Sequence, residues 1–201
     1  MEKLQSSIVN AGILIFENPP IFIPWIPAGC RNAGWLLPVS VMKQKEVFQS
    51  VPGILRPFKD FLEKKGLKAG DQVVYYGCPG TCTPFVELLG FAVRGMNLEQ
   101  VFVPYVDESK AQKLKQVPDI GMQAAGAVKV SSPKAVVVMG GLAMPNVPVT
   151  LEQVKAAVEK YPDATFIGIC FMKMFEKGGW LKAMDFDLLI DATIDPVEVW
   201  K

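Results

Sequence analysis

Between residue 51 and the C-terminus, apolar positions recur at helical spacing in several segments. Helices are predicted around residues 55–62, 83–95 and 150–161, with a shorter one at 171–177. Thr150 and Gln153 match the pattern of a capping box, in which the two residues satisfy each other's backbone amides at the start of a helix. A more polar segment, residues 108–116, is also predicted to be helical.

Short apolar runs separate these helices. Strands are predicted at residues 72–76, 100–106, 135–139, 165–170 and 188–192, and a short one at 127–130 within an otherwise irregular stretch, 117–133. Pro104 places the second strand at a sheet edge or shortens it. The runs are continuous rather than alternating, which is typical of strands buried on both faces. The pattern predicts a single α/β domain over about 46–201. It is three-layered, with a mostly parallel, doubly wound sheet of Rossmann or flavodoxin type and helices on both faces.

The first 41 residues have a different composition, with five prolines and only four charged side chains. Their apolar stretch, residues 8–16, is far shorter than the roughly 20 residues that a membrane span needs. No signal-peptide cleavage pattern follows it. We therefore interpret residues 1–41 as a disordered arm or a start-site artefact, with translation beginning at Met42.

Composition excludes several classes of function. Formal net charge is +1 and basic residues form no long run, which argues against a nucleic-acid partner. The chain contains no histidine, so Ser-His-Asp and Cys-His catalysis and His-ligated zinc are excluded. Four cysteines in 201 residues do not make a secreted disulfide scaffold. A cytoplasmic protein with no membrane partner is expected, and self-association is left open.

Three loops with unusual residues follow predicted strands at 77–82, 140–145 and 170–172. The carboxyl ends of parallel strands share one sheet edge, where such folds bind ligands. If Thr83 caps the next helix and Pro84 is its first residue, the amides of Phe85 and Val86 are free to bind an anion. The candidate ligand-binding residues are Gly77, Cys78, Gly80, Thr81, Cys82, Thr83, Gly140 and Gly141. Neither a P-loop nor a G-x-G-x-x-G motif is present, so no particular cofactor is indicated.

The cysteines offer an alternative. Cys78 and Cys82 are spaced C-x3-C, and a thiol at a helix N-terminus has a lowered pKa, so Cys82 is the candidate reactive thiol. Cys170 could join them to bind a metal or an iron–sulfur cluster. The same cysteines could equally be buried packing residues. Asp107, just past the second strand, is a candidate general acid or base.

The three loops read Gly77-Cys-Pro-Gly-Thr-Cys-Thr-Pro-Phe85, Gly140-Gly-Leu-Ala-Met-Pro145 and Cys170-Phe-Met172. In these residues the chain resembles an archaeal family known as domain of unknown function 2124. The resemblance covers about 46–201 and implies an α/β fold and an archaeal, cytoplasmic setting. It implies no particular activity, substrate or catalytic residue.

The leading hypothesis is therefore a small-molecule-binding protein that holds an anionic ligand or cofactor fragment in the 77–85 loop. The first alternative is a thiol-based protein, metal-binding or redox-active, that uses Cys78, Cys82 and Cys170. The second is a non-catalytic interaction module with an exposed apolar patch. Whether the protein is an enzyme is left open by the sequence.

Overall fold

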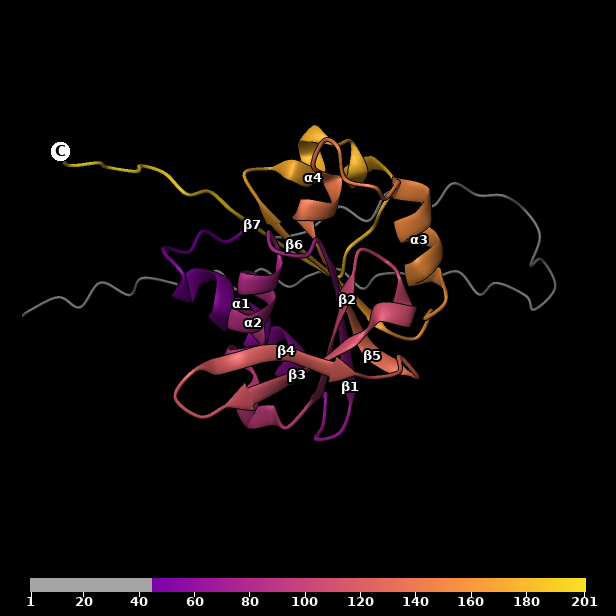
Figure 1. The fold of residues 1–201 in the computed structure, drawn as a ribbon. Helices are drawn as coiled ribbons and strands as arrows, with labels where there is room; N and C mark the ends of the chain where they lie inside the picture. The colour runs from indigo at the N-terminus through magenta and orange to yellow at the C-terminus, as the bar shows by residue number, and fades with distance from the viewer. Residues whose placement is uncertain (1–44) are drawn as a thin grey trace, which may run out of the picture. The chain divides into compact units, whose positions relative to one another are not determined.

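The computed structural model describes residues 45–201, so the hypotheses about residues 1–41 and Met42 fall outside it. These residues build one sheet of seven strands in the order β4-β3-β2-β1-β5-β6-β7 (Figure 1). The strands are β1 (Gln72–Gly77), β2 (Glu99–Pro104), β3 (Gln112–Val117), β4 (Gly121–Ala127), β5 (Pro133–Met139), β6 (Thr165–Phe171) and β7 (Leu188–Ala192). The α-helices are α1 (Pro52–Lys64), α2 (Thr83–Ala92), α3 (Leu151–Glu159) and α4 (Met174–Lys177). Four 3-10 turns join them: η1 (Arg94–Met96), η2 (Glu108–Lys110), η3 (Gly140–Ala143) and η4 (Trp180–Lys182).

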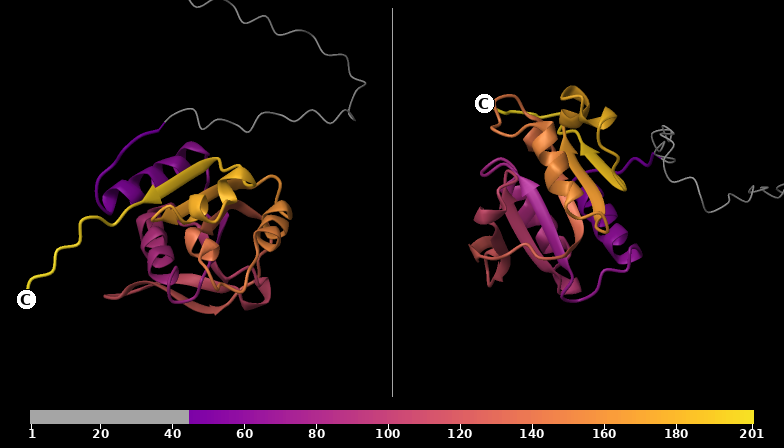
Figure 2. Two further views of the ribbon diagram at one scale, coloured as in Figure 1. Left: turned by 90° about the horizontal axis from the view of Figure 1, so that it is seen from above. Right: turned by 90° about the vertical axis from the view of Figure 1, so that its right-hand side faces the viewer.

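The predicted α/β class is confirmed. Strands β2, β1, β5, β6 and β7 run parallel, and every residue of β1 is buried, as a continuous apolar run requires. Helices α1 and α2 pack together on one face of the sheet and α3 covers the other (Figure 2). The predicted capping box is present at α3, where Thr150 and Gln153 each accept the other's backbone amide. Within residues 45–201, no helix is both long and apolar enough to cross a bilayer.

A buried polar chain fixes β1, β2 and α2 relative to one another. The Tyr75 hydroxyl donates to Gln100 Oε1 at 3.0 Å, and Gln100 Nε2 donates to the Gly90 carbonyl at 3.1 Å. The Tyr75 ring lies 6.3 Å from that of Phe58 in α1, centroid to centroid. Because a buried polar group costs stability unless it is hydrogen-bonded, this chain favours one register of β1 against β2.

The prediction of a helix at 108–116 is wrong. After the short turn η2, the chain forms β3, which pairs antiparallel with β2 and with β4. Ala111 and Leu114 are the buried positions here, and Leu114 lies against α2, so tertiary packing overrides the polar, helix-compatible composition. The short strand predicted at 127–130 is also wrong, because β4 occupies the segment before it and ends at Ala127. Asp119, at φ +62°, makes the tight turn between the two strands.

The two edges of the sheet differ. At the β4 edge, the Glu87 carboxylate of α2 accepts the backbone amide of Ala124 at 3.3 Å and the side-chain amide of Gln123 at 3.5 Å. At the other edge, β7 pairs with β6 only. Pro104 is the last residue of β2, so it shortens that strand, which is interior and not an edge.

Candidate functional site

The candidate loops lie where the chain leaves adjacent strands in opposite directions. β1 and β5 are parallel neighbours, but the chain passes from β1 towards β2 and from β5 towards β6 (Figure 1). The 77–82 loop and η3 therefore diverge at the carboxyl edge of the sheet. Such a switch point is the usual ligand position in open α/β sheets.

The first loop is a tight turn whose amides are used internally. The Gly80 amide donates to Thr83 Oγ1 at 3.2 Å, and the Cys82 amide donates to the Cys78 carbonyl at 2.9 Å. Helix α2 is capped by Cys82 instead of Thr83, one residue earlier than predicted. The amides of Phe85 and Val86 both donate to the Cys82 carbonyl at 3.0 Å, so the prediction that they are free for an anion is wrong. Gly80, at φ +77°, and Thr81 remain exposed at the tip of the turn.

The turn brings the Cys78 and Cys82 thiols together. Both sulfurs lie beside Gly141, since a Cβ built on that residue would meet Cys82 Sγ and lie 3.8 Å from Cys78 Sγ. Both thiols are buried, at 4% and 3% exposure. Two of the predicted glycines make room for Cys82. A Cβ on Gly77 would lie 2.8 Å from Cys82 Cβ, and one on Gly141 would overlap Cys82 Sγ.

Hydrogen bonding separates the acidities of the two thiols. Donation from the Cys78 thiol lowers the pKa of Cys82, and the two backbone amides lower it further, against the opposing effect of burial. The same hydrogen bond, in which Cys78 is the donor, raises the pKa of Cys78, and burial adds to that rise. Cys82 is therefore the more acidic thiol of the pair.

Cys170 lies on the other side of η3. A Cβ on Gly140 would lie 2.8 Å from Cys170 Sγ, and the Phe175 amide donates to that sulfur at 3.3 Å. Burial raises the pKa of Cys170, which is 1% exposed. The three loops thus converge as predicted, with Cys78 and Cys82 in contact and Cys170 behind the neighbouring glycine. Among residues 45–201, no three Cys, Asp or Glu side chains are arranged so that they could share a metal ion.

The carboxylate of Asp107 contacts residues of η2 and takes no part in the Cys78–Cys82 pair. Its carboxylate caps η2 by accepting the Ser109 amide at 3.2 Å and pairs with the Lys110 ammonium at 2.9 Å. Hydrogen bonding from Ser109, followed by that from Lys110, lowers the pKa of Asp107. This is the arrangement of a capping residue, and it keeps the carboxylate ionised.

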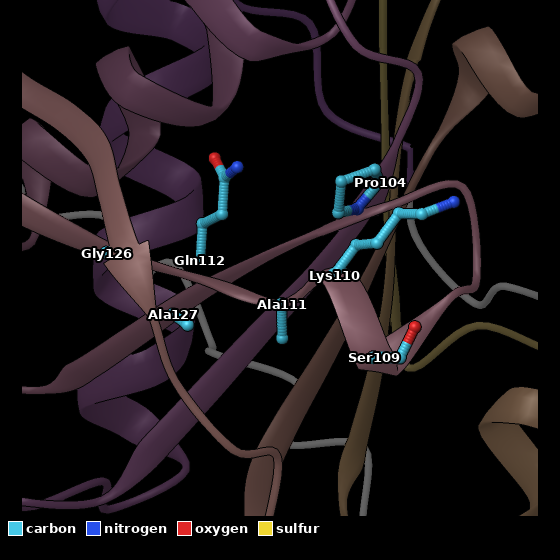
Figure 3. Close-up of a pocket in the computed structure, with 7 residues that line it drawn as sticks. All are labelled: Pro104, Ser109, Lys110, Ala111, Gln112, Gly126 and Ala127. Atoms are coloured by element: carbon cyan, nitrogen blue, oxygen red, sulfur yellow. The ribbon is translucent and has the colours of Figure 1, made fainter.

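Among the hollows formed by residues 45–201 are a small one and a larger groove that the sequence did not indicate. The smaller, of about 460 Å³, lies between the end of β2, η2 and the β3–β4 hairpin (Figure 3). Its lining residues are Pro104, Ser109, Lys110, Ala111, Gln112, Gly126 and Ala127. The larger, a groove of about 860 Å³, runs between residues 45–57 and β7. It reaches Phe85 and Phe171, whose ring centroids lie 4.1 Å apart. No local sequence motif predicts the groove, because it is lined by segments that are more than 130 residues apart in the chain.

The similarity to a known protein family falls within the part of the chain that the structure describes. The profile of a family described as "Uncharacterized protein conserved in archaea (DUF2124)" matches residues 49–195. The chain is 38% identical over 141 residues to the "Uncharacterized protein MJ1183" of Methanocaldococcus jannaschii, covering 70% of this chain and 84% of that protein. It is 36% identical over 134 residues to a protein of Methanothermobacter thermautotrophicus, covering 66% and 85%. A crystal structure of a protein of unknown function from Methanothermobacter thermautotrophicus superposes with a TM-score of 0.70 at 30% identity, covering 80% of this chain and 99% of that one. The chain therefore belongs to the archaeal family DUF2124.

Proposed function

We propose that the protein is a thiol–disulfide redox protein whose working pair is Cys78 and Cys82. The observation that carries the proposal is the placement of the Cys78 and Cys82 sulfurs together beside Gly141, with Cys82 at the N-terminal cap of α2. Thiolate, not thiol, is the nucleophile in disulfide exchange, and donors directed at one sulfur favour its ionised form.

The local backbone is also compatible with a disulfide between Cys78 and Cys82. The hydrogen bond from the Cys82 amide to the Cys78 carbonyl makes one α-helix-like turn. Residues four apart in such a turn have Cα atoms roughly 6 Å apart, within the range that a disulfide spans. Cys82 stands at the start of α2, where the helix dipole adds a further preference for the thiolate.

The proposed exchange with a disulfide substrate RS–SR′ has two steps. The Cys82 thiolate attacks one substrate sulfur, forming Cys82–S–SR and releasing R′S⁻, which takes a proton from solvent. The Cys78 thiol then gives its proton to solvent, and the resulting thiolate attacks the Cys82 sulfur, which forms the Cys78–Cys82 disulfide and releases RS⁻, which takes a proton from solvent. The protein dithiol is oxidised by two electrons and the substrate disulfide is reduced by two. In a cytoplasm, where we propose that the protein acts, thiol reductants would restore the dithiol.

The test is trapping. The single variants Cys78→Ser and Cys82→Ser, each with Cys170→Ser as background, are incubated with oxidised glutathione and analysed by peptide mass spectrometry. The variant that keeps Cys82 should accumulate a mixed disulfide at that residue, and the variant that keeps Cys78 should react far more slowly. The protein with both thiols should instead form the Cys78–Cys82 disulfide. Failure of both thiols to form that disulfide in any glutathione buffer would refute the proposal.

Binding of a small anionic ligand is the second candidate. One observation favours it: Gly80 and Thr81 are exposed at the switch point, the place where open α/β sheets bind ligands. The two candidates separate in one experiment. Replacement of both Cys78 and Cys82 by serine would abolish disulfide exchange but leave the thermal stabilisation by a phosphorylated metabolite intact. Metal analysis of anaerobically purified protein tests the metal form of the thiol alternative.

A further inference from the structure

The C-terminal nine residues, 193–201, have no regular secondary structure and pair with no strand in the described part of the chain. Residues 193–201 leave the end of β7 and run away from the domain (Figure 1, Figure 2). Val197, Val199 and Trp200 are 72%, 74% and 88% exposed. β-branched and aromatic residues favour strands, and large apolar side chains that protrude together usually mark a contact surface.

β7 is an edge strand and lacks a neighbour on its outer side in the described part of the chain. It pairs with β6 on one side only, and none of its residues is fully buried, whereas β1 is buried throughout. Among residues 45–201, its outer edge has no backbone hydrogen-bond partner. An open edge of this kind is a template for an added strand.

The groove of about 860 Å³ borders β7. All five residues of β7 line it, and Val47, Phe48 and Val51 form part of the opposite wall. These three side chains are themselves largely exposed. The groove therefore offers both backbone edge groups and apolar side chains to one extended segment. Residues 196–201 would span about 20 Å as a strand, against about 17 Å for the five residues of β7.

We propose that two copies of the chain exchange their C-terminal tails, so that residues 196–201 of each copy add as a strand to β7 of the other and fill its groove. The occupant is a second copy because the tail extends away from its own domain, while Thr193, Ile194 and Asp195 line the groove at the tail's root. Reciprocal exchange of this kind closes with twofold symmetry and satisfies both tails and both edges at once. The inference is independent of the thiol chemistry.

The first experiment compares the full chain with a variant that lacks residues 196–201, by sedimentation velocity across a range of concentrations. The full chain should be a dimer. The shortened chain should be a monomer with an unchanged circular dichroism spectrum, because the deleted residues contact nothing in the domain core. A full chain that is monomeric throughout, or a shortened chain that still forms the dimer, overturns the proposal.

Two matched substitutions test whether dimerisation depends on the tail itself or on exposed apolar side chains in general. Val199→Asp puts a carboxylate into a groove that Glu46, Asp191 and Asp195 already line, and it should weaken dimerisation by about tenfold or more, because burying a further negative charge there is costly. Ile120→Asp changes a residue of similar exposure, 69%, in the β3–β4 turn and should leave dimerisation unchanged. Equal effects of the two substitutions would contradict the assignment of the interface.

A peptide identifies the occupant directly. A synthetic peptide of residues 193–201, with its single tryptophan, should bind the shortened chain, and its fluorescence should shift to the blue as Trp200 leaves water. It should not bind the full-length dimer, whose grooves are filled. No binding to the shortened chain refutes the proposal, as does a monomeric full chain in which Trp200 is already protected by its own groove.

Discussion

Replacing Gly141 by alanine tests how tightly the second loop holds the Cys82 sulfur. The backbone of Gly141 is outside the left-handed region, so the substitution changes packing and not conformation. An added Cβ would overlap Cys82 Sγ, and the next atoms are Cys78 Sγ at 3.8 Å and Cys78 Cβ at 3.9 Å, which are ordinary contacts. The whole perturbation is therefore one methyl group against one sulfur atom.

The expected loss of stability follows from that single clash. Overpacking a well-packed core costs about 1–3 kcal/mol. Replacing glycine by alanine returns about 0.4–1 kcal/mol by restricting the unfolded chain. Because the added Cβ would overlap the sulfur, the overpacking cost falls in the upper half of its range, and the net loss is about 1–2.6 kcal/mol, which lowers the melting temperature by about 2–10 °C in a domain of this size. Differential scanning calorimetry of the reduced protein measures it.

A double-mutant cycle identifies the cause. In a Cys82→Ala background the clashing sulfur is gone, so Gly141→Ala should cost almost nothing there. If the two changes are instead additive to within about 0.5 kcal/mol, the sulfur is not the atom that Gly141 accommodates, and the reasoning is refuted. Gly140→Ala is the contrasting case, because its Cβ would lie 2.9 Å from the backbone Cα of Cys170 and removal of the Cys170 thiol cannot relieve that. Gly95→Ala, with nothing within 4 Å, is the control that should not destabilise.

Three further predictions concern the rest of the domain. Thr150→Ala removes the hydroxyl that accepts the Gln153 amide and should cost about 1 kcal/mol in urea unfolding, whereas Thr150→Ser should cost little. Tyr75→Phe leaves Gln100 Oε1 buried without its donor and should cost about 1–3 kcal/mol by the same measurement; a loss near zero would show that the buried polar chain contributes nothing to stability. Burial, together with the nearby Glu108 carboxylate, raises the pKa of Tyr161 to about 12 from 10.0. The stabilisation of the folded state by the neutral Tyr161 hydroxyl should therefore be fully present below pH 10 and be lost as pH rises from 10 to 12. In urea unfolding across this pH range, Tyr161→Phe should lack this part of the fall in the free energy of unfolding.

The sequence was sufficient for the parallel part of the fold because each buried strand carries its own signal there. The run of residues 135–139 is apolar throughout, and it is short enough for a buried strand but too short for a typical helix. The β3–β4 hairpin carried a much weaker signal. Only Ala111, Leu114 and Met122 are fully buried between residues 111 and 127, so the strand character of this segment comes from pairing with β2 and from contact with α2.

The site was predictable in place but not in detail. Placing the loops needed only the rule that parallel strands end on one edge, and Gly77 and Gly141 were predicted only as candidate ligand-binding residues. What Gly77 and Gly141 approach is the Cys82 sulfur, and that depends on β1 and β5 being neighbours, which no local pattern encodes. The cap of α2 was displaced by one residue for a similar reason. The Cys82 carbonyl accepts two amides, which is possible only because the preceding turn is already tight.

The Glu87 carboxylate on the Ala124 amide has a consequence for how far assembly can grow. A sheet with two open edges can add strands at both, and copies then join end to end into fibres. Here an acidic side chain from α2 already occupies a backbone donor on the outer side of β4, and it would repel an incoming carbonyl oxygen. Only the opposite edge is left to accept a strand. When two copies exchange tails reciprocally, both tails and both β7 edges are used within the pair, so no strand-accepting edge is left for a third copy.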